Sequence, residues 1–223
     1  MAKSTESKVL EIKPVEIRKV KVRIVGTSPL IVHAWGHKAK QEMLDKQMGK
    51  TKTKSRDLKN PVQDFIDSLY WIEGKPEEYT MEAFEKAVAN GARWGFPVTA
   101  IKQGAAMAAS RNELGIPSTR IKGAFFIEGE GPDLLAEIKG CTPTMREDMV
   151  RVGGMTKTAD IRFRGEFSNW YMDLTIAYNV NGPISIEQIL NLVNMGGFTC
   201  GLGEWRPERD GSFGMYHVDT CTD

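Results

Sequence analysis

The sequence lacks the features that mark membrane, disulfide-rich and disordered proteins. No run of apolar residues approaches the roughly 18 that a transmembrane helix needs. Its three cysteines form no CxxC pair, which argues against a disulfide framework and a zinc ribbon. Five Trp, five Tyr and nine Phe supply enough apolar area for a core, so bulk disorder is excluded. The polar N-terminal stretch 1–8 has no hydrophobic signal region, and we expect a protein of the reducing cytoplasm.

An excess of charge of either sign is also missing. Lys and Arg total 30 and Asp and Glu total 29, so the formal net charge is +1. This value excludes a protein that is basic throughout, but not one with a local basic surface. Between residues 37 and 59, eight cations stand against three anions, so this segment carries +5 and the remainder about −4. Its centre, 49–56, is predicted to be a mobile loop, either a solvated linker or a contact to phosphates.

Catalytic motifs are absent as well. The three histidines, His33, His37 and His217, have no HExxH pattern or cysteine partner, and no GxSxG or P-loop motif occurs. We therefore expect no metal, no cofactor and no catalytic residue. The alternative is cleavage of RNA by His33, which would need a Tyr or Lys nearby as a second proton-transfer group.

The pattern of apolar residues predicts an antiparallel sheet with helices on one face. Residues 20–25 alternate apolar and polar side chains, as a half-buried strand does. Capping residues predict helix starts at three positions: Asn60, Thr80 and Ser185. The alanine-rich stretch 97–110 is predicted to be a helix buried against a sheet.

Four further segments are candidate strands: 120–127, 134–138, 161–167 and 171–178. The last two are expected to form a hairpin that turns near 168–170. Residues 140–158 are predicted to be a long loop or a β-ribbon. Without its insertions the order is close to βαββαβ, an α+β class with a ferredoxin-like or RNA-recognition-motif core. Such a sheet often offers its open face to single-stranded nucleic acid.

Three separated segments resemble the RAMP superfamily, the RNA-binding proteins of CRISPR systems. Residues 22–31 resemble the family's opening strand with its G-x-S-P-L end, and residues 96–105 are similar to its proline-started first helix. The glycine loop, defined here as residues 201–214 with Gly201, Gly203, Gly211 and Gly214, is similar to the family's C-terminal glycine-rich loop. Its centre, 204–210, is longer and more charged than the simplest family pattern. The resemblance spans about residues 20 to 218.

Within that superfamily the chain looks more like the CRISPR effector backbone subunit, and it also resembles phage proteins. The resemblance implies a non-catalytic protein that binds single-stranded RNA or DNA in the cytoplasm of a bacterial or phage-infected cell. It implies a homo-oligomer along the strand, helical where the subunits stack regularly, and no membrane partner. Two alternatives stay open: a RAMP-like endoribonuclease using His33, and a structural or inhibitory phage protein that mimics a CRISPR subunit.

The expected domain organisation is simple. A flexible N-terminal arm, 1–19, precedes a single RAMP-like domain, 20–223. A helical insertion, 34–95, and a thumb-like ribbon, 139–160, are expected within that domain.

The candidate nucleic-acid contacts combine cations for phosphates, an aromatic ring for base stacking and glycines that let backbone N–H groups approach a phosphate. They are Lys50, Lys52, Lys54, Arg56, Lys102, Arg146, Arg151, Lys157, Arg162, Arg164, Gly201, Gly203, Trp205, Arg206 and Arg209. Stacking of a base on Trp205 would be worth about 1–3 kcal/mol. Each has a structural alternative: Trp205 in the core, Arg206 paired with Glu204 or Glu208, and exposed strand or ribbon positions for the other arginines.

Overall fold

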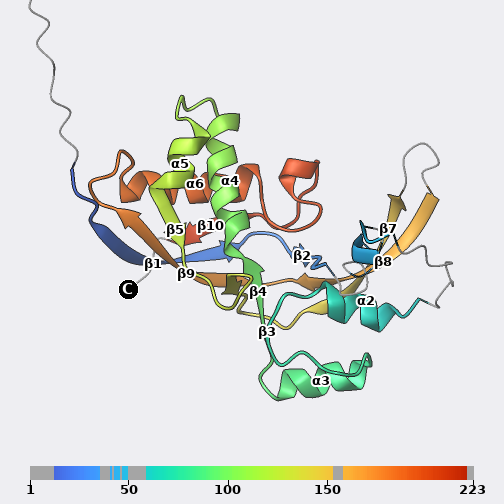
Figure 1. Ribbon diagram of the computed structural model, residues 1–223. Helices are drawn as coiled ribbons and strands as arrows, with labels where there is room; N and C mark the ends of the chain where they lie inside the picture. Colours follow the sequence, from blue (N-terminus) through green and yellow to red (C-terminus); the bar gives the residue numbers. More distant parts are fainter. Residues whose placement is uncertain are drawn as a thin grey trace, which may run out of the picture.

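The computed structural model describes residues 13–35, 41, 43–45, 47–49, 59–152 and 158–219 (Figure 1). The strands are β1 (Ile17–Gly26), β2 (Leu30–Val32), β3 (Trp71–Glu73), β4 (Arg93–Pro97), β5 (Phe125–Ile127), β6 (Leu135–Glu137), β7 (Thr144–Val152), β8 (Thr158–Phe167), β9 (Tyr171–Asn179) and β10 (Tyr216–Asp219). The helices are α2 (Pro61–Ser68), α3 (Met81–Ala89), α4 (Val98–Arg111), α5 (Ser118–Ala124), α6 (Ile186–Thr199) and the short 3-10 helix η1 (Pro207–Arg209). The fold is therefore mixed α and β, and its strand pairs are antiparallel.

A four-stranded sheet forms the main layer, in the order β10-β1-β9-β5. β1 pairs with β9 from Ile17 opposite Asn179 to Val25 opposite Tyr171. The helices α4, α5 and α6 lie on one face of this sheet (Figure 1). The predicted alternation of the first strand is confirmed, because Ile24 is fully buried in the core while Lys21 is exposed.

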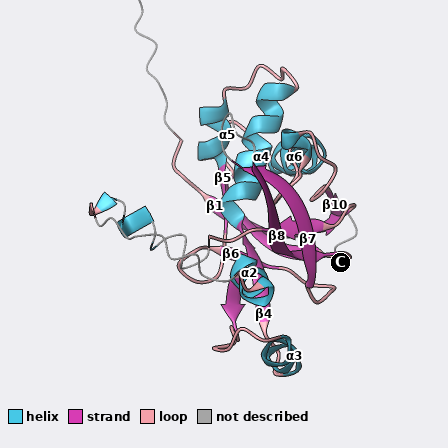
Figure 2. Cartoon of the chain, turned by 90° about the vertical axis from the view of Figure 1, so that its right-hand side faces the viewer, coloured by secondary structure: helices cyan, strands magenta, loops and turns pink. Residues whose placement is uncertain are grey.

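Two smaller sheets of the described residues extend the main one, β2-β8-β7 and β3-β4-β6. β7 and β8 form a long hairpin, called the ribbon below, in which Arg146 lies opposite Arg164. Its base is fixed by α2, since the buried Ser68 hydroxyl oxygen accepts a hydrogen bond from Gly165 N at 2.8 Å. In Figure 2, α4, α5 and α6 lie on one side of the strands, and α2 and α3 lie on the other.

The predicted helix starts are confirmed by their capping contacts. The Asn60 side chain accepts from two backbone N–H groups of the first turn of α2, and Thr80 accepts from Ala83 N. Ser185 and Gln188 form a capping box at the start of α6. The caps are local interactions, and a single sequence specifies them well for that reason.

The predicted hairpin of 161–167 with 171–178 is wrong. β8 pairs with β2 and β7, whereas β9 pairs with β1 and β5, so the two segments belong to different sheets. Trp170 lies between them, but it is buried, and its indole N–H donates to Ser28 O at 2.9 Å. The chain therefore passes from one sheet to the other at this tryptophan instead of turning back.

The segment 120–127 is a strand only at its end. α5 occupies most of it, and β5 begins at Phe125. β1 begins at Ile17, three residues inside the predicted arm of 1–19. The described part of the predicted insertion contains α2 and α3 and also the strand β3.

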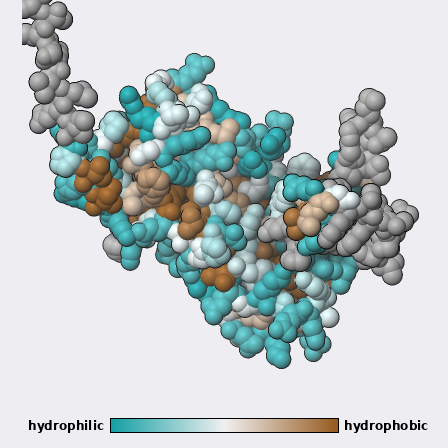
Figure 3. Space-filling model, in the orientation of Figure 1, coloured by the Kyte–Doolittle hydropathy of each residue, from teal (hydrophilic) through white to brown (hydrophobic). Residues whose placement is uncertain are grey.

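Helix α3 extends away from the main sheet, and the surface at the bottom of Figure 3, where it lies, is mainly hydrophilic. Phe84 anchors it, because its ring packs edge-on against Phe65 with centroids 5.0 Å apart and against Trp71 at 6.2 Å. Among the described helices, none combines the length and the apolar character that crossing a bilayer requires.

Candidate nucleic-acid interface

The glycine loop docks on the strand β2. Glu204 N donates to Ile31 O at 2.9 Å, and Gly214 N donates to Pro29 O at 2.8 Å. Gly203 adopts φ +72°, and a Cβ at this position would overlap the Ile31 carbonyl oxygen. The glycines observed here therefore let the loop approach β2 closely, which is a structural role.

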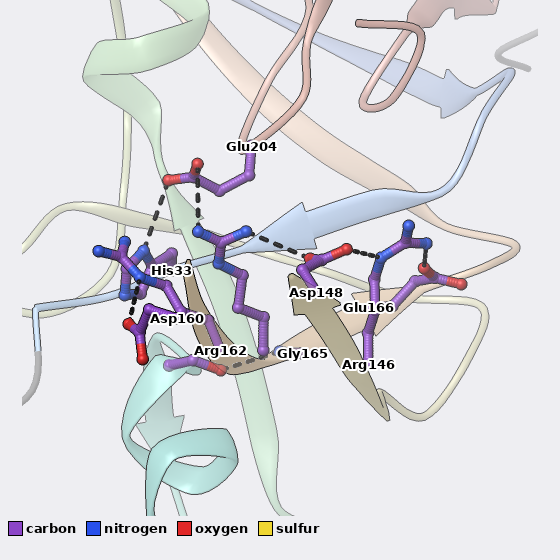
Figure 4. A network of polar contacts seen from close by, with 10 residues as sticks. His33, Arg146, Asp148, Asp160, Arg162, Gly165, Glu166 and Glu204 are labelled. Carbon is purple, nitrogen blue, oxygen red and sulfur yellow. Dashed lines mark hydrogen bonds and ion pairs between the residues drawn. The ribbon is translucent and has the colours of Figure 1, made fainter. Parts of the chain in front are cut away.

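One face of the ribbon carries alternating charges. Cross-strand partners point to the same side, so Arg146 and Arg164 share this face with Asp148 and Arg162, which also lie opposite each other. Figure 4 shows Arg146, Asp148 and Arg162 together with Glu204 of the glycine loop. Arg146 contacts Asp148 at 2.9 Å and Glu166 at 2.5 Å.

Two of the predicted cations on this face differ in their accessibility. Arg162 is half-buried and lies 3.5 Å from Asp160. The Arg164 residue is only 2 % exposed. Its Nη1 donates to Asp148 Oδ2 at 3.2 Å, while no partner is found for its Nε among the described residues. Arg164 is therefore held inside the fold and does not face solvent.

The ribbon and the glycine loop meet through two side-chain contacts. The Arg164 Nη2 atom lies 3.8 Å from Glu204 Oε2. The guanidinium of Arg146 lies over the Phe213 ring, 4.7 Å from its centroid. The ribbon and the glycine loop, which the sequence suggested as two separate sites, are thus in contact.

Glu204 also reaches the end of β2. Its Oε1 lies 3.5 Å from His33 Nδ1 (Figure 4). The contact with His33, followed by the charges of Arg164 and Arg206, holds the pKa of Glu204 below its usual range, although partial burial opposes this. These contacts favour the ionised form of the Glu204 carboxylate.

The other loop residues do not all face a ligand. Arg206 donates to Glu208 Oε2 at 2.9 Å and to Gly203 O at 2.8 Å, which is the structural alternative foreseen for it. Trp205 is 42 % exposed, so it is not part of the core, and its backbone adopts φ +52°. Arg209 is exposed at the end of η1. Trp205 and Arg209 are the loop side chains with the best access to solvent among the predicted contacts.

A cavity of about 300 Å³ opens between the glycine loop and α4. Its wall contains His33, Tyr70, Glu204, Arg206 and Arg209. The Tyr70 hydroxyl points to the His33 carbonyl oxygen at 3.5 Å. Burial, together with the charges of Glu204 and Asp133, raises the pKa of Tyr70. This cavity thus combines cations with groups that can accept or donate a proton.

The remaining predicted contacts lie elsewhere or outside the described residues. Lys102 Nζ lies 3.8 Å from the centroid of Phe126, and its burial lowers the pKa of Lys102. Arg151 is exposed on the opposite face of the ribbon from Arg146. The candidates outside the described residues are Lys50, Lys52, Lys54, Arg56 and Lys157.

The open face of the main sheet holds cations that were not among the predicted nucleic-acid contacts. Lys19, Lys21 and Arg23 alternate along β1 and point away from the helices. Arg23 lies over the Tyr171 ring, 4.3 Å from its centroid, and donates to Asp173 at 2.8 Å. Apolar patches also lie in the region of β1 and β5 in Figure 3. The signal was present in the alternating KVKVR of 19–23, whose polar side faces outward.

The comparisons with known proteins do not supply a family. No family model matches the chain, and no match is found among the curated proteins.

Proposed function

We propose that the protein binds single-stranded nucleic acid, RNA or DNA, and assembles side by side along it in the manner of a CRISPR backbone subunit. The proposed core is ferredoxin-like. The strand order β10-β1-β9-β5, with α4 and α5 between β1 and β5 and α6 between β9 and β10, supports it, since a βαββαβ chain of that fold places its first and third strands centrally. The RAMP-like motifs fall on β1, α4 and the glycine loop.

The carrying observation is the contact between the ribbon and the glycine loop. Arg146 on Phe213 and Arg164 near Glu204 join segments that lie more than 30 residues apart in the sequence. Trp205 adjoins this junction, because its carbonyl oxygen accepts from Phe213 N at 3.0 Å, and both Trp205 and Arg209 of the loop are exposed. A strand that crosses the junction would find an aromatic ring for stacking and a cation for a phosphate within one surface.

The ion pairs on the ribbon limit how strongly this surface attracts the phosphates of a strand. Arg146 and Arg162 are neutralised by neighbouring carboxylates, so they position a strand more than they attract it. The long-range attraction therefore falls to the +5 segment of residues 37–59. Binding should then depend strongly on salt and on few cations.

A salt titration of binding tests this proposal. Fluorescence anisotropy with a labelled single-stranded RNA and DNA is measured for the wild type and for a variant with Lys50, Lys52 and Lys54 replaced by Ala. If all three contact phosphates, the slope of log K against log salt falls by about 2, from roughly 0.7 per phosphate on single strands. The matched control replaces the exposed Lys13, Lys86 and Lys122 by Ala and keeps the wild-type slope. Failure of every single strand to bind at low salt would contradict the proposal.

The assembly part has its own test. Electron microscopy of the protein with and without single-stranded nucleic acid should show filaments or rows only when the strand is present. Ordered oligomers that form equally well without it would favour the structural or inhibitory alternative instead.

A second candidate function is endoribonuclease activity at His33. The observation that favours it is the cavity in which His33, Tyr70 and Glu204 lie together. His33 would transfer one proton and Tyr70 a second, with Glu204 orienting the imidazole. Labelled RNA is incubated with the wild type, His33→Ala and Tyr70→Phe. Cleavage that is absent in the wild type, or unchanged by His33→Ala, removes this reading.

A further inference from the structure

The carboxylate of Glu204 lies near basic side chains from three different segments. His33 at the end of β2 lies 3.5 Å away, and Arg164 of β8 lies 3.8 Å away. The charge of Arg206, in the loop itself, also acts on this carboxylate and lowers its pKa. The fold brings these side chains to Glu204, because His33 and Arg164 are distant from it in the sequence.

Glu204 lies close to Arg164 without satisfying its hydrogen bonds, whereas Arg206 is already paired with Glu208 and with Gly203 O. The distance of 3.8 Å from Arg164 Nη2 exceeds that of a hydrogen bond. The Nε of Arg164 has no partner among the described residues, although the residue is only 2 % exposed. A buried guanidinium normally uses most of its five donors, so this cation has unused capacity toward an anion with more oxygens.

Space and access for such an anion are present. The cavity of about 300 Å³ is lined by His33, Glu204 and Arg206. Arg164 is not part of this lining, and its Nη2 atom lies 3.8 Å from the Glu204 carboxylate that is. The Glu204 side chain is 41 % exposed, so it can turn toward solvent without crossing the core. A phosphate group carries up to two charges and several acceptor oxygens in place of one carboxylate.

We propose that Glu204 occupies the position of a phosphate group, and that His33, Arg164 and Arg206 form a site for a nucleotide phosphate that opens when this carboxylate turns away. The site deepens the proposed function and rests on it only for the source of the phosphate, a strand or a free nucleotide. Glu204 then acts as an internal competitor that weakens binding of every phosphate ligand.

The decisive variant is Glu204→Gln, which keeps the shape of the side chain and removes its charge. Binding of inorganic phosphate, of a 5′-mononucleotide and of its unphosphorylated nucleoside is measured by isothermal titration calorimetry on the full chain. We expect phosphate and the mononucleotide to bind at least about tenfold more tightly to Glu204→Gln than to the wild type, because one repelling charge is gone. The nucleoside should bind equally to both.

Two further variants locate the effect. Glu113→Gln removes an exposed carboxylate after α4 and should leave phosphate affinity unchanged. Adding His33→Gln to Glu204→Gln should reverse most of the gain, and circular dichroism checks that each variant is folded. Equal affinity of Glu204→Gln and wild type, an equal gain in Glu113→Gln, or a gain that survives His33→Gln would each overturn the inference.

The same variants separate the inference from the proposed function. A short oligonucleotide with internal phosphates only is titrated beside the mononucleotide, which distinguishes strand from free nucleotide as the source. If strands bind but Glu204→Gln changes neither ligand, the phosphate site is overturned and the proposed function stands. If Glu204→Gln gains affinity for the mononucleotide while no strand binds, the site stands and the proposed function fails.

Discussion

At the scale of single residues, glycines with the same backbone conformation can have different structural roles. Gly91 and Gly203 both have positive φ, +83° and +72°. A Cβ at Gly91 would meet open space, whereas one at Gly203 would overlap the carbonyl of Ile31. Sequence alone shows only that both are glycines, so the docking of the loop on β2 was not predictable from them.

This difference gives a matched pair of substitutions. Gly91→Ala should lower the free energy of unfolding by about 1–2 kcal/mol, the cost of a left-handed backbone in a residue with a Cβ. Gly203→Ala should lower it by about 3 kcal/mol or more, because steric overlap with Ile31 adds to the same strain. Urea denaturation of both variants measures this. Similar losses in the two would show that the loop does not depend on its close approach to β2.

The buried serine of α2 offers a second residue-scale prediction. Ser68 Oγ donates to Phe65 O at 2.7 Å and accepts from Gly165 N at 2.8 Å. Ser68→Ala leaves that N–H without this acceptor in the interior and should lower the free energy of unfolding by about 1–3 kcal/mol. Ser110→Ala, at an exposed position of α4, should change it little. Urea denaturation of both variants decides, and a tolerated Ser68→Ala would mean that the ribbon base is held by packing alone.

The carboxylate partners of the predicted cations could not be predicted from residue type. Residue type suggested that Arg146, Arg162 and Arg164 contact phosphates, and β-strand periodicity predicted that Arg162 and Arg164 share one face. It did not reveal Asp148 opposite Arg162 or Glu204 near Arg164, because these contacts depend on strand register and loop docking. Charge partners across a sheet are tertiary information.

At the scale of elements, local signals predicted the capped helices well, but they missed α5 and predicted strand partners poorly. The caps at Asn60, Thr80 and Ser185 and the alternation of β1 are all confirmed. Alternation shows which side chains share a face, but not which strand lies alongside. The hairpin expected from β8 and β9 failed for this reason, since consecutive alternating strands can enter different sheets.

Packing of α4 on α6 gives an element-scale prediction. A Cβ at Gly196 would lie 2.9 Å from Ala105 N, whereas one at Gly104 would meet Cys200 Cβ at an ordinary 3.8 Å. Gly196→Ala should push the helices apart and lower the free energy of unfolding by about 1–3 kcal/mol. Gly104→Ala should be neutral or stabilise by up to about 1 kcal/mol through helix propensity.

Thermal and urea unfolding of the two variants check this pair. Loss of stability in Gly104→Ala that matches the loss in Gly196→Ala would mean that the interface is not as close as the structure shows. The two substitutions are otherwise equivalent, since each adds one methyl group inside a helix.

At the scale of the whole molecule, carboxylates in several places are ionised more readily than usual. The Arg23 contact, with Lys139 beside it, holds the pKa of Asp173 below its usual range. Arg93 does the same for the pKa of Glu137. These groups lie on the main sheet and on the sheet of β3, β4 and β6. Acid should therefore weaken more than one part of the fold.

The sign of the effect follows from linkage. A carboxylate whose pKa is lower in the folded state adds stability above its unfolded pKa, near 4. That contribution is lost as pH falls through the folded value. Urea midpoints should thus change little from pH 7 to 5 and fall from pH 5 to 3. Asp173→Asn and Arg23→Gln should each reduce the fall by a similar amount. A wild-type fall retained in both would refute the assignment.

The position of β1 in the main sheet bears on how the chain folds during synthesis. β1 is made early, yet it pairs with β9 and β10, which begin at Tyr171 and Tyr216. A nascent chain therefore carries β1 without either neighbour until most of the domain has left the ribosome. Long-range pairing of this kind slows folding. Until β9 arrives, the buried side of β1, with Val22 and Ile24, is an apolar strand open to chaperones and to other nascent chains.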